Sequence, residues 1–448
     1  MADARFAYAC KMGAGGEPMK RQLGTMERAL VFVDDLSSLF IVVALRLVNG
    51  PPPEVLQRAL AILQKRHPLL RVRIVKEGGR LYFETAADAP AIPLQVSRRQ
   101  DDQQWRAVTE AELNGQIDAG SAPLMRVHYL HAGGQDAPGE VILSCHHTIM
   151  DAAAGANFCR ELLSLCGTLW AGQPIEGYGP LAPVPPAERL YPAAFQGGRR
   201  LWRTATFLLR QMRDEMSYRR QAGAGRRPAV HAAVQTRCLF AQLPADATAR
   251  FAGRARREGV TLNSGLAAAE LLAVHKHLYQ GQAIPLRAIA FSDLRPYLKP
   301  PVRPENLGSY FSMLQYTVPM GGQQDLWALA RTVQQSIYRL NKRGDKFVTP
   351  LLTKTLFQMM SKQRAYRLAA TGLSYTDAVD LEPSYGPIRV VGLHGFIPNN
   401  PLGPEYALFG RLLFDRLWLD VFYSPEDMER QTAQAITDEI CHLVGEDR

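Results

Sequence analysis

Strand-like and helix-like segments alternate along this chain, with one interruption. Of all the sequence features, this alternation places the strongest limit on the fold. The interruption at 176–198 is rich in residues that break regular structure: Gly177, Gly179, Pro180, Pro183, Pro185, Pro186, Pro192 and the pair Gly197-Gly198. Such a stretch predicts an irregular crossing between domains. A chain of 448 residues is also long enough for two hydrophobic cores. We therefore expect an α/β protein with an N-terminal domain at 1–175, a crossing at 176–198 and a C-terminal domain at 199–448.

Hydrophobic periodicity predicts the elements within each half. The expected strands are 39–48, 67–75, 81–83, 124–131 and 140–146 before the crossing, and 235–243, 287–292, 309–318 and 417–423 after it. The expected helices are 53–66, 104–114 and 152–169, then 199–221, 245–257, 262–279, 325–341, 350–370 and 425–444. The pair Gly78-Gly79 predicts a hairpin between two of the strands. The two halves share a loose order of strands and helices, which indicates paired subdomains.

The net charge indicates which kinds of partner the protein can bind, and the cysteine content indicates the compartment in which it works. A net charge of +10 favours anionic partners, namely nucleic acid, anionic lipid, coenzyme phosphates or an acidic carrier protein. The sequence has no zinc-finger spacing or aromatic RNA-binding signature, so we do not expect nucleic acid as a partner. Six scattered cysteines favour a reducing compartment. The longest apolar run, 39–45, is too short to span a membrane, and we expect a cytoplasmic protein.

The expected helix at 199–221 is unusually basic, and three interpretations of it stay open. It carries Arg210, Arg213, Arg219 and Arg220 beside apolar residues such as Trp202. The first interpretation is an ordinary surface helix. The second is a docking surface that binds either an acidic carrier protein or coenzyme phosphates. The third is an amphipathic helix on an anionic membrane. The last interpretation predicts a peripheral membrane contact.

The run His146-His147-Thr148-Ile149-Met150-Asp151 at the end of the strand 140–146 is the strongest candidate site. Neighbouring strand residues point to opposite faces, so one histidine packs inward and the other faces a cavity. Asp151, at the start of the next helix, is placed for an N-cap or a salt bridge. An imidazole titrates near neutral pH and suits removal of a proton from a hydroxyl or amine that attacks a thioester.

Three other interpretations of this run compete with a general base. Two adjacent histidines at a strand end can be ordinary polar residues that hydrogen-bond to the backbone. His147 and Asp151 could bind a metal together with His128 or His131, although no further metal signature is present. Cys145 could be a nucleophile, although its strand context favours a buried small hydrophobe.

The run resembles the HHxxxD motif of the chloramphenicol acetyltransferase-like superfamily, which includes nonribosomal peptide condensation domains and the stand-alone polyketide-associated acyltransferases of mycobacteria. Further segments resemble motifs of that group along nearly the whole chain. They are Arg21-Gln22-Leu23-Gly24-Thr25-Met26-Glu27, Arg66-His67-Pro68-Leu69-Leu70-Arg71, Ser292-Asp293-Leu294-Arg295-Pro296, Asn306-Leu307-Gly308 and Gly372-Leu373-Ser374-Tyr375-Thr376.

The resemblance implies two chloramphenicol acetyltransferase-like subdomains with an active-site tunnel at their interface. His147 would be the catalytic base and His146 structural. Asp151 would pair with Arg295 and tie the two subdomains together, and Ser374 would contact the oxyanion or the substrate.

The resemblance also implies a function. We expect an acyltransferase that moves an acyl group from coenzyme A or a carrier-protein phosphopantetheinyl thioester to a hydroxyl of a small or lipid-like acceptor, in bacterial secondary or lipid metabolism. The donor is a substrate, and we expect no metal and no permanently bound cofactor. One alternative is a free-standing condensation enzyme that forms an amide. Another, from a different class, is a catalytically silent binding scaffold.

Overall fold

The computed structural model describes residues 18–134, 137–227, 234–363 and 367–445. These residues form two compact units whose sequences interleave. The first unit takes the described part of residues 1–190 together with 295–310 and 380–397, and the second takes 191–294, 311–379 and the described part of 398–448. The sequence-based domains, 1–175 and 199–448, are continuous instead. Two later segments therefore return to the first unit.

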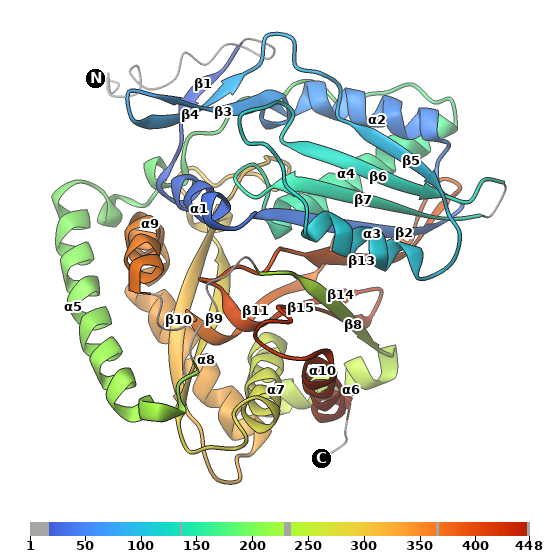
Figure 1. The fold of residues 1–448 in the computed structure, drawn as a ribbon. Helices are drawn as coiled ribbons and strands as arrows, with labels where there is room; N and C mark the ends of the chain where they lie inside the picture. The colour runs from blue at the N-terminus through green and yellow to red at the C-terminus, as the bar shows by residue number, and fades with distance from the viewer. Residues whose placement is uncertain (1–17, 135–136, 228–233, 364–366, 446–448) are drawn as a thin grey trace. The chain divides into compact units, whose positions relative to one another are not determined.

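The first unit is built on a six-stranded sheet in the order β12-β13-β2-β7-β6-β5. Figure 1 labels five of these strands, from β13 to β5. Its strands are β2 (Phe40–Val48), β5 (Leu94–Arg98), β6 (Met125–His131), β7 (Pro138–His146), β12 (Ser384–Tyr385) and β13 (Ile388–Phe396). β2 pairs antiparallel with both β7 and β13, with Phe40 opposite His146 and Ala44 opposite His394. β2 is apolar except for Arg46, as expected of a strand whose two faces are both covered by helices.

The helices of the first unit are α1 (Thr25–Leu36), α2 (Pro53–Arg66), α3 (Gln104–Leu113) and α4 (Ala152–Trp170). α4 contacts α2 and passes Val43 of β2 at Gly155. α3 lies on the opposite face, because Trp105 stacks on His394, the strand neighbour of Ala44, with ring centroids 4.6 Å apart. β1 (Lys20–Gln22), β3 (Val72–Glu77) and β4 (Arg80–Thr85) form a separate three-stranded sheet. Gly78 and Gly79 turn the predicted β3–β4 hairpin with positive φ angles, which glycine adopts without steric cost.

The second unit has a six-stranded sheet in the order β10-β9-β11-β14-β15-β8. Its strands are β8 (Arg237–Leu243), β9 (Pro285–Asp293), β10 (Phe311–Pro319), β11 (Ala369–Ala378), β14 (Pro404–Leu413) and β15 (Arg416–Tyr423). Its helices are α5 (Gly197–Ala222), α6 (Ala245–Arg257), α7 (Leu262–His277), α8 (Leu326–Arg343), α9 (Asp345–Gln363) and α10 (Arg430–Gly445). α7 packs between α8 and α10 and contacts β9 and β11 (Figure 1), so it is apolar on nearly all sides.

The predicted crossing is irregular, with only short 3-10 turns at Ala187–Arg189 and Ala193–Phe195 before α5 begins at Gly197. Arg66 holds its start, because Nη1 donates to the carbonyls of Gly177 and Gly179 at 3.1 and 2.9 Å. None of the described helices is long and apolar enough to cross a membrane.

The core of the second unit contains a buried carboxyl whose titration should be visible in the stability of the protein. Burial raises the pKa of Glu405 from 4.5 to about 7, against the lowering effects of Arg227 and of a 2.8 Å hydrogen bond from the Tyr279 hydroxyl. A raised carboxyl pKa means that the folded state binds the proton more tightly than the unfolded state. Its stabilisation is therefore complete below pH 4.5 and is lost as the pH rises through about 7.

We expect Glu405→Gln to remove this dependence, because the amide is neutral at every pH. As the pH rises from 4.5 to about 7, the unfolding free energy of the variant should rise relative to that of wild type, by up to about 3 kcal/mol. Denaturant titrations at a series of pH values measure this, with the exposed Glu429→Gln as control. Parallel curves for Glu405→Gln and wild type would contradict the raised pKa.

Candidate active site

The HHxxxD run forms the end of β7, a tight turn and the start of α4, all within the first unit. β7 ends at His146, and His147 is the first residue of the turn. The turn is stabilised by a bond from the Ile149 N–H to the His146 carbonyl at 3.1 Å. A parallel bridge joins Met150 to Gly308, in the returning segment 295–310. The run is thus held by a segment more than a hundred residues away in sequence.

His147 is buried, and its backbone is fixed on both sides. Its N–H donates to the Leu39 carbonyl at 3.3 Å, and the Ser309 hydroxyl donates to its carbonyl. The ring Nδ1 lies 2.9 Å from the Met150 carbonyl oxygen. A carbonyl only accepts, so Nδ1 carries the hydrogen and Nε2 carries the lone pair of the neutral ring. This tautomer has its basic nitrogen on the side away from the Met150 carbonyl.

Burial lowers the pKa of His147 from its ordinary value of 6.5, and the neighbouring Asp151 and the backbone bond only partly offset this effect. The neutral ring therefore predominates at neutral pH, and only the neutral ring can accept a proton.

His146 is fully buried and bound inside the same turn. Its Nδ1 accepts the Thr148 N–H at 3.2 Å and lies 2.8 Å from the Thr148 hydroxyl. Its Nε2 is 3.4 Å from a carboxylate oxygen of Asp34. Both ring nitrogens face partners within the turn and α1, which suits the predicted structural role.

Asp151 acts as both an N-cap and an ion-pair partner. One carboxylate oxygen accepts the Ala154 N–H at 2.9 Å and caps α4. The other accepts from Arg295 Nη1 at 2.9 Å and from the Tyr310 N–H at 2.8 Å. All three donors belong to the first unit. The predicted pairing of Asp151 with Arg295 is therefore present, and both residues lie within the first unit.

Arg295 connects this carboxylate to the returning segment. Its Nη2 donates to the Gly308 carbonyl at 3.2 Å, and its guanidinium lies over the Tyr310 ring at 4.9 Å from the centroid. Gly308 has φ of +138°, and a Cβ there would come within 2.5 Å of the Tyr310 ring. Glycine is therefore required where the segment turns against Met150.

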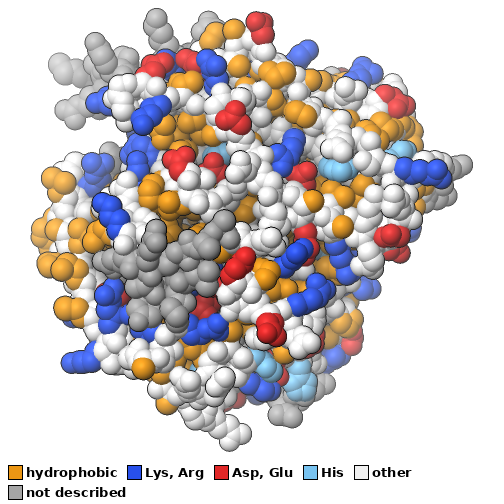
Figure 2. All heavy atoms as spheres, in the orientation of Figure 1, with side chains coloured by type: hydrophobic (Ala, Val, Ile, Leu, Met, Phe, Trp, Pro, Cys, Tyr) orange, Lys and Arg blue, Asp and Glu red, His pale blue; other side chains and the backbone are white. Residues whose placement is uncertain are grey.

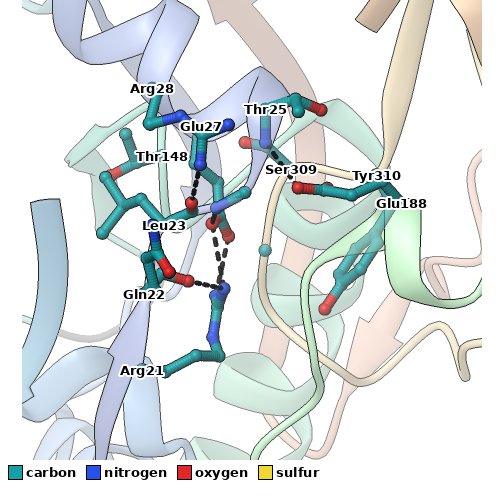
Figure 3. Close-up of polar contacts among 12 residues, drawn as sticks. Arg21, Gln22, Leu23, Thr25, Glu27, Arg28, Thr148, Glu188, Ser309 and Tyr310 are labelled. Carbon is teal, nitrogen blue, oxygen red and sulfur yellow. Dashed lines mark hydrogen bonds and ion pairs between the residues drawn. The ribbon is translucent and has the colours of Figure 1, made fainter. Parts of the chain in front are cut away.

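A second buried ion pair lies beside the start of α1, also in the first unit (Figure 3). Arg21 holds both carboxylate oxygens of Glu27 at 2.9 and 2.7 Å, and Glu27 also accepts the Gly24 N–H at 2.5 Å. The Thr25 N–H donates to Glu188 at 2.9 Å. Figure 3 draws these groups together with Thr148, Ser309 and Tyr310, and the charges of Arg21 and Glu27 act on the Tyr310 side chain. The segment 21–27, which resembles a motif of the superfamily, thus fixes the start of α1 within the unit that contains the candidate site.

His67 of the first unit also lies against a carboxylate. Its Nε2 is 2.7 Å from Glu161, which Arg66 also approaches at 3.3 Å. The cavity beside it, lined among others by Leu69 and Tyr310, has a volume of only about 20 Å³. That is room for one water and not for a substrate, so this pair ties α2 to α4 and is a poor catalytic candidate.

The two alternative chemistries depend on Cys145 and on the histidines of β6. Cys145 is buried, and burial raises the pKa of its thiol, so it is a poor nucleophile. His128 lies 3.0 Å from the Ser97 hydroxyl, and His131 lies 3.1 Å from the Tyr129 hydroxyl, both on β6. Among the residues that the structure describes, no group of three or more histidine, cysteine, aspartate or glutamate side chains is arranged to hold a metal.

The remaining predicted site residues lie in the second unit. Ser374 is half-buried on β11, opposite Phe409 of β14, and its contact with an oxyanion or substrate stays a prediction. On α5, Arg210 pairs with Asp345 at 3.3 Å and Arg219 pairs with Glu215. Arg213 and Arg220 are exposed.

Sequence reasoning missed Ser309 and Tyr310. Each contributes through one hydrogen bond to the HHxxxD run, Ser309 from its hydroxyl and Tyr310 from its backbone. The Asn306-Leu307-Gly308 motif precedes them, and the predicted strand 309–318 contains them, but neither signal indicated a role at the site.

The chain has the chloramphenicol acetyltransferase-like fold, as predicted from the sequence. Polyketide synthase associated protein 5 from Mycobacterium tuberculosis superposes with a TM-score of 0.65 at 19% identity, over 95% of this chain and 98% of that one. Trichothecene 15-O-acetyltransferase from Fusarium sporotrichioides superposes with a TM-score of 0.74 at 12% identity, over 98% and 97%. The starter condensation domain of rhizomide synthetase, in complex with C8-CoA and Leu-SNAC, gives 0.69 at 15% identity, over 95% and 94%.

Within that fold, residues 231–345 match the family described as the C-terminus of phthiocerol/phthiodiolone dimycocerosyl transferase. A search of curated proteins gave no match. The family match covers less than half of the chain, and the structural likenesses at these identities establish the fold.

Proposed function

We propose that the chain transfers an acyl group from a thioester of coenzyme A or of a carrier protein to a hydroxyl acceptor, with His147 as general base. The observation that carries the proposal is the hydrogen bond from Nδ1 to the Met150 carbonyl, which leaves Nε2 as the basic nitrogen. The match to a dimycocerosyl transferase family and the fold shared with an O-acetyltransferase both support acyl transfer to oxygen.

The reaction then needs one proton acceptor and no enzyme nucleophile. Nε2 takes the proton of the acceptor hydroxyl as its oxygen attacks the thioester carbonyl. The new C–O bond forms, the C–S bond breaks, and the proton passes from the imidazolium to the departing thiolate. Asp151 and Arg295 take no part in the proton transfer, because their bonds to each other and to Tyr310 hold the turn that positions the ring.

Amide formation is the second candidate, because the rhizomide condensation domain of the same fold was captured with an acyl-CoA and an aminoacyl thioester. A matrix of donors and acceptors distinguishes the two. Purified protein is offered acyl-CoA or acyl carrier protein, each with alcohols or amines, and the products are identified by mass spectrometry. Ester products alone support the proposal, and amides alone favour the condensation enzyme. Absence of turnover in every combination would favour a silent scaffold.

The pH dependence of turnover tests the assignment of the base. Because burial lowers the pKa of His147 from 6.5, the reactive neutral form persists into mildly acidic solution. We expect kcat/KM to be level from about pH 8 downward and to fall only below pH 6.5, since this parameter reports ionisations of the free enzyme. An acid limb centred above pH 6.5 would contradict the assignment.

A further inference from the structure

Helix α5 is attached to the second unit by one side only. Phe207 is buried, and Arg210 and Glu215 form ion pairs with Asp345 and Arg287 at 3.3 and 2.5 Å. The Tyr218 ring lies 3.9 Å beneath the Arg287 guanidinium. These contacts define an inner face of the helix.

The opposite side of α5 is also apolar, and it is exposed. Leu201, Trp202, Leu209, Met212 and Met216 have exposed fractions of 69%, 70%, 69%, 63% and 65%. With the exposed Ala205, the series from Trp202 to Met216 advances by alternating steps of three and four residues, so it follows one stripe of the helix. At roughly 100° per residue the stripe points away from Phe207. We call these six residues the outer face of α5.

Such clustering is unusual for a surface that meets only water. Of the eleven large hydrophobic side chains described as exposed, five lie on this one helix. Isolated exposed apolar residues are ordinary, but a contiguous stripe marks an interaction surface.

Arginine borders the outer face. Arg199 and Arg200 precede it, Arg219 and Arg220 follow it, and Arg213, with a side chain 75% exposed, lies along its edge. Figure 2 shows hydrophobic side chains gathered at the left margin, where α5 runs, with basic side chains beside them. Only Asp214 and Glu215 bring negative charge to the helix, and Glu215 is engaged by Arg287 and Arg219.

The combination of an apolar stripe with bordering arginines restricts which partner can bind the outer face of α5. A second copy would bring two arginine-bordered faces together, and like charges would repel. An anionic bilayer satisfies both parts of the surface, because leucine, methionine and tryptophan partition into the boundary between headgroups and acyl chains while arginine binds lipid phosphates. The stripe is a convex ridge on a single helix, which enters a deformable lipid surface without needing a matching groove.

We propose that the outer face of α5 binds the surface of an anionic lipid membrane, so that the protein is a peripheral membrane protein. The inference goes beyond the proposed acyl transfer and does not depend on it.

Sedimentation with vesicles tests the proposal on the full chain. One vesicle preparation is phosphatidylcholine alone, and the other is equal parts of phosphatidylcholine and phosphatidylglycerol. We expect binding at least about tenfold tighter to the anionic vesicles, weakening as salt is added. The triple variant Trp202→Ser, Leu209→Ser, Met212→Ser should bind about tenfold less or weaker still. The matched control Tyr338→Ser, Met359→Ser alters exposed residues of α8 and α9 and should bind like wild type.

A charge pair gives a second, independent readout. Arg213→Gln, Arg220→Gln should weaken binding about tenfold or more, whereas Arg256→Gln, Arg257→Gln, with the same change of charge on exposed positions of α6, should have a smaller effect. Failure to bind anionic vesicles, or equal binding by the triple variant, would refute the proposal. It would also fall if the triple variant lost self-association or binding to an acyl carrier protein instead, because the face would then serve a protein partner. Turnover of soluble substrates is measured separately, so failure of either proposal is distinguishable.

Discussion

Replacing His147 by glutamine should lower kcat by about 10²–10⁴-fold, the range that a positioned general base contributes. The amide is close in size to imidazole and can still donate to the Met150 carbonyl, which His147 Nδ1 contacts at 2.9 Å, but it has no basic nitrogen. His147→Ala should lose at least as much activity, with some loss of stability because the side chain is buried. Single-turnover assays with the best donor and acceptor from the substrate matrix measure the chemical step.

His128→Gln is the matched control for this change. His128 belongs to the same unit, and burial lowers its pKa as well, but it lies on β6 beside Ser97. Its replacement should leave turnover within a few-fold of wild type. If His147→Gln retained wild-type turnover with an unchanged thermal midpoint, the imidazole would not be the base.

Replacing Arg295 by methionine should lower the free energy of unfolding by about 3–5 kcal/mol, because it leaves the buried Asp151 carboxylate without its cation. The loss should also weaken catalysis, since the same carboxylate caps α4 and anchors the turn that carries His147. Arg295→Lys should be milder, because it retains the charge while losing the second arm to the Gly308 carbonyl. Denaturant titration of the purified proteins gives the comparison.

A double variant separates the ion pair from simple loss of packing. Asp151→Leu with Arg295→Met removes both charges, so it should be more stable than the sum of the two single changes. The exposed Arg213→Met serves as control and should change stability by about 0.5 kcal/mol or less. Equal effects of Arg295→Met and Arg213→Met would mean that the buried pair contributes little.

Local sequence signals predicted the elements that form from neighbouring residues. The helix predicted at 53–66 has those bounds in the structure, because Pro53 starts it and the apolar spacing continues to Arg66. The Gly78-Gly79 hairpin also formed as expected. The predicted end of α9 was wrong. The helix was predicted to continue to residue 370, whereas α9 ends at Gln363 and β11 begins at Ala369. Alanine favours helix, but parallel pairing of Ala369 with Pro404 decides its conformation.

One of the missed strands depends on a distant partner. β13 contains Gly392 and Gly395, which weaken a strand signal, and it forms by pairing with β2, more than three hundred residues earlier. β14 and the short β5 were missed although each pairs with a strand near it in sequence, β15 and β6. β1, β11 and β12 were missed as well. At the site, the side chains of the motif were identifiable, whereas Tyr310 acts through a backbone N–H that every residue except proline possesses. The returning segment that brings it to Asp151 is set by tertiary structure.

The interleaving of the two units has a consequence for synthesis. While the ribosome is still translating the second half, β2 has β7 on one edge and no neighbour on the other, since β13 is not made until residues 388–396 emerge. The Asp151 carboxylate likewise lacks its Arg295 ion-pair partner until that residue has been made. The nascent first unit therefore carries an uncompensated charge until Arg295 is made and an open strand edge until residues 388–396 are made, a state prone to aggregation. The sheet of the first unit is complete only after residues 388–396 have been made.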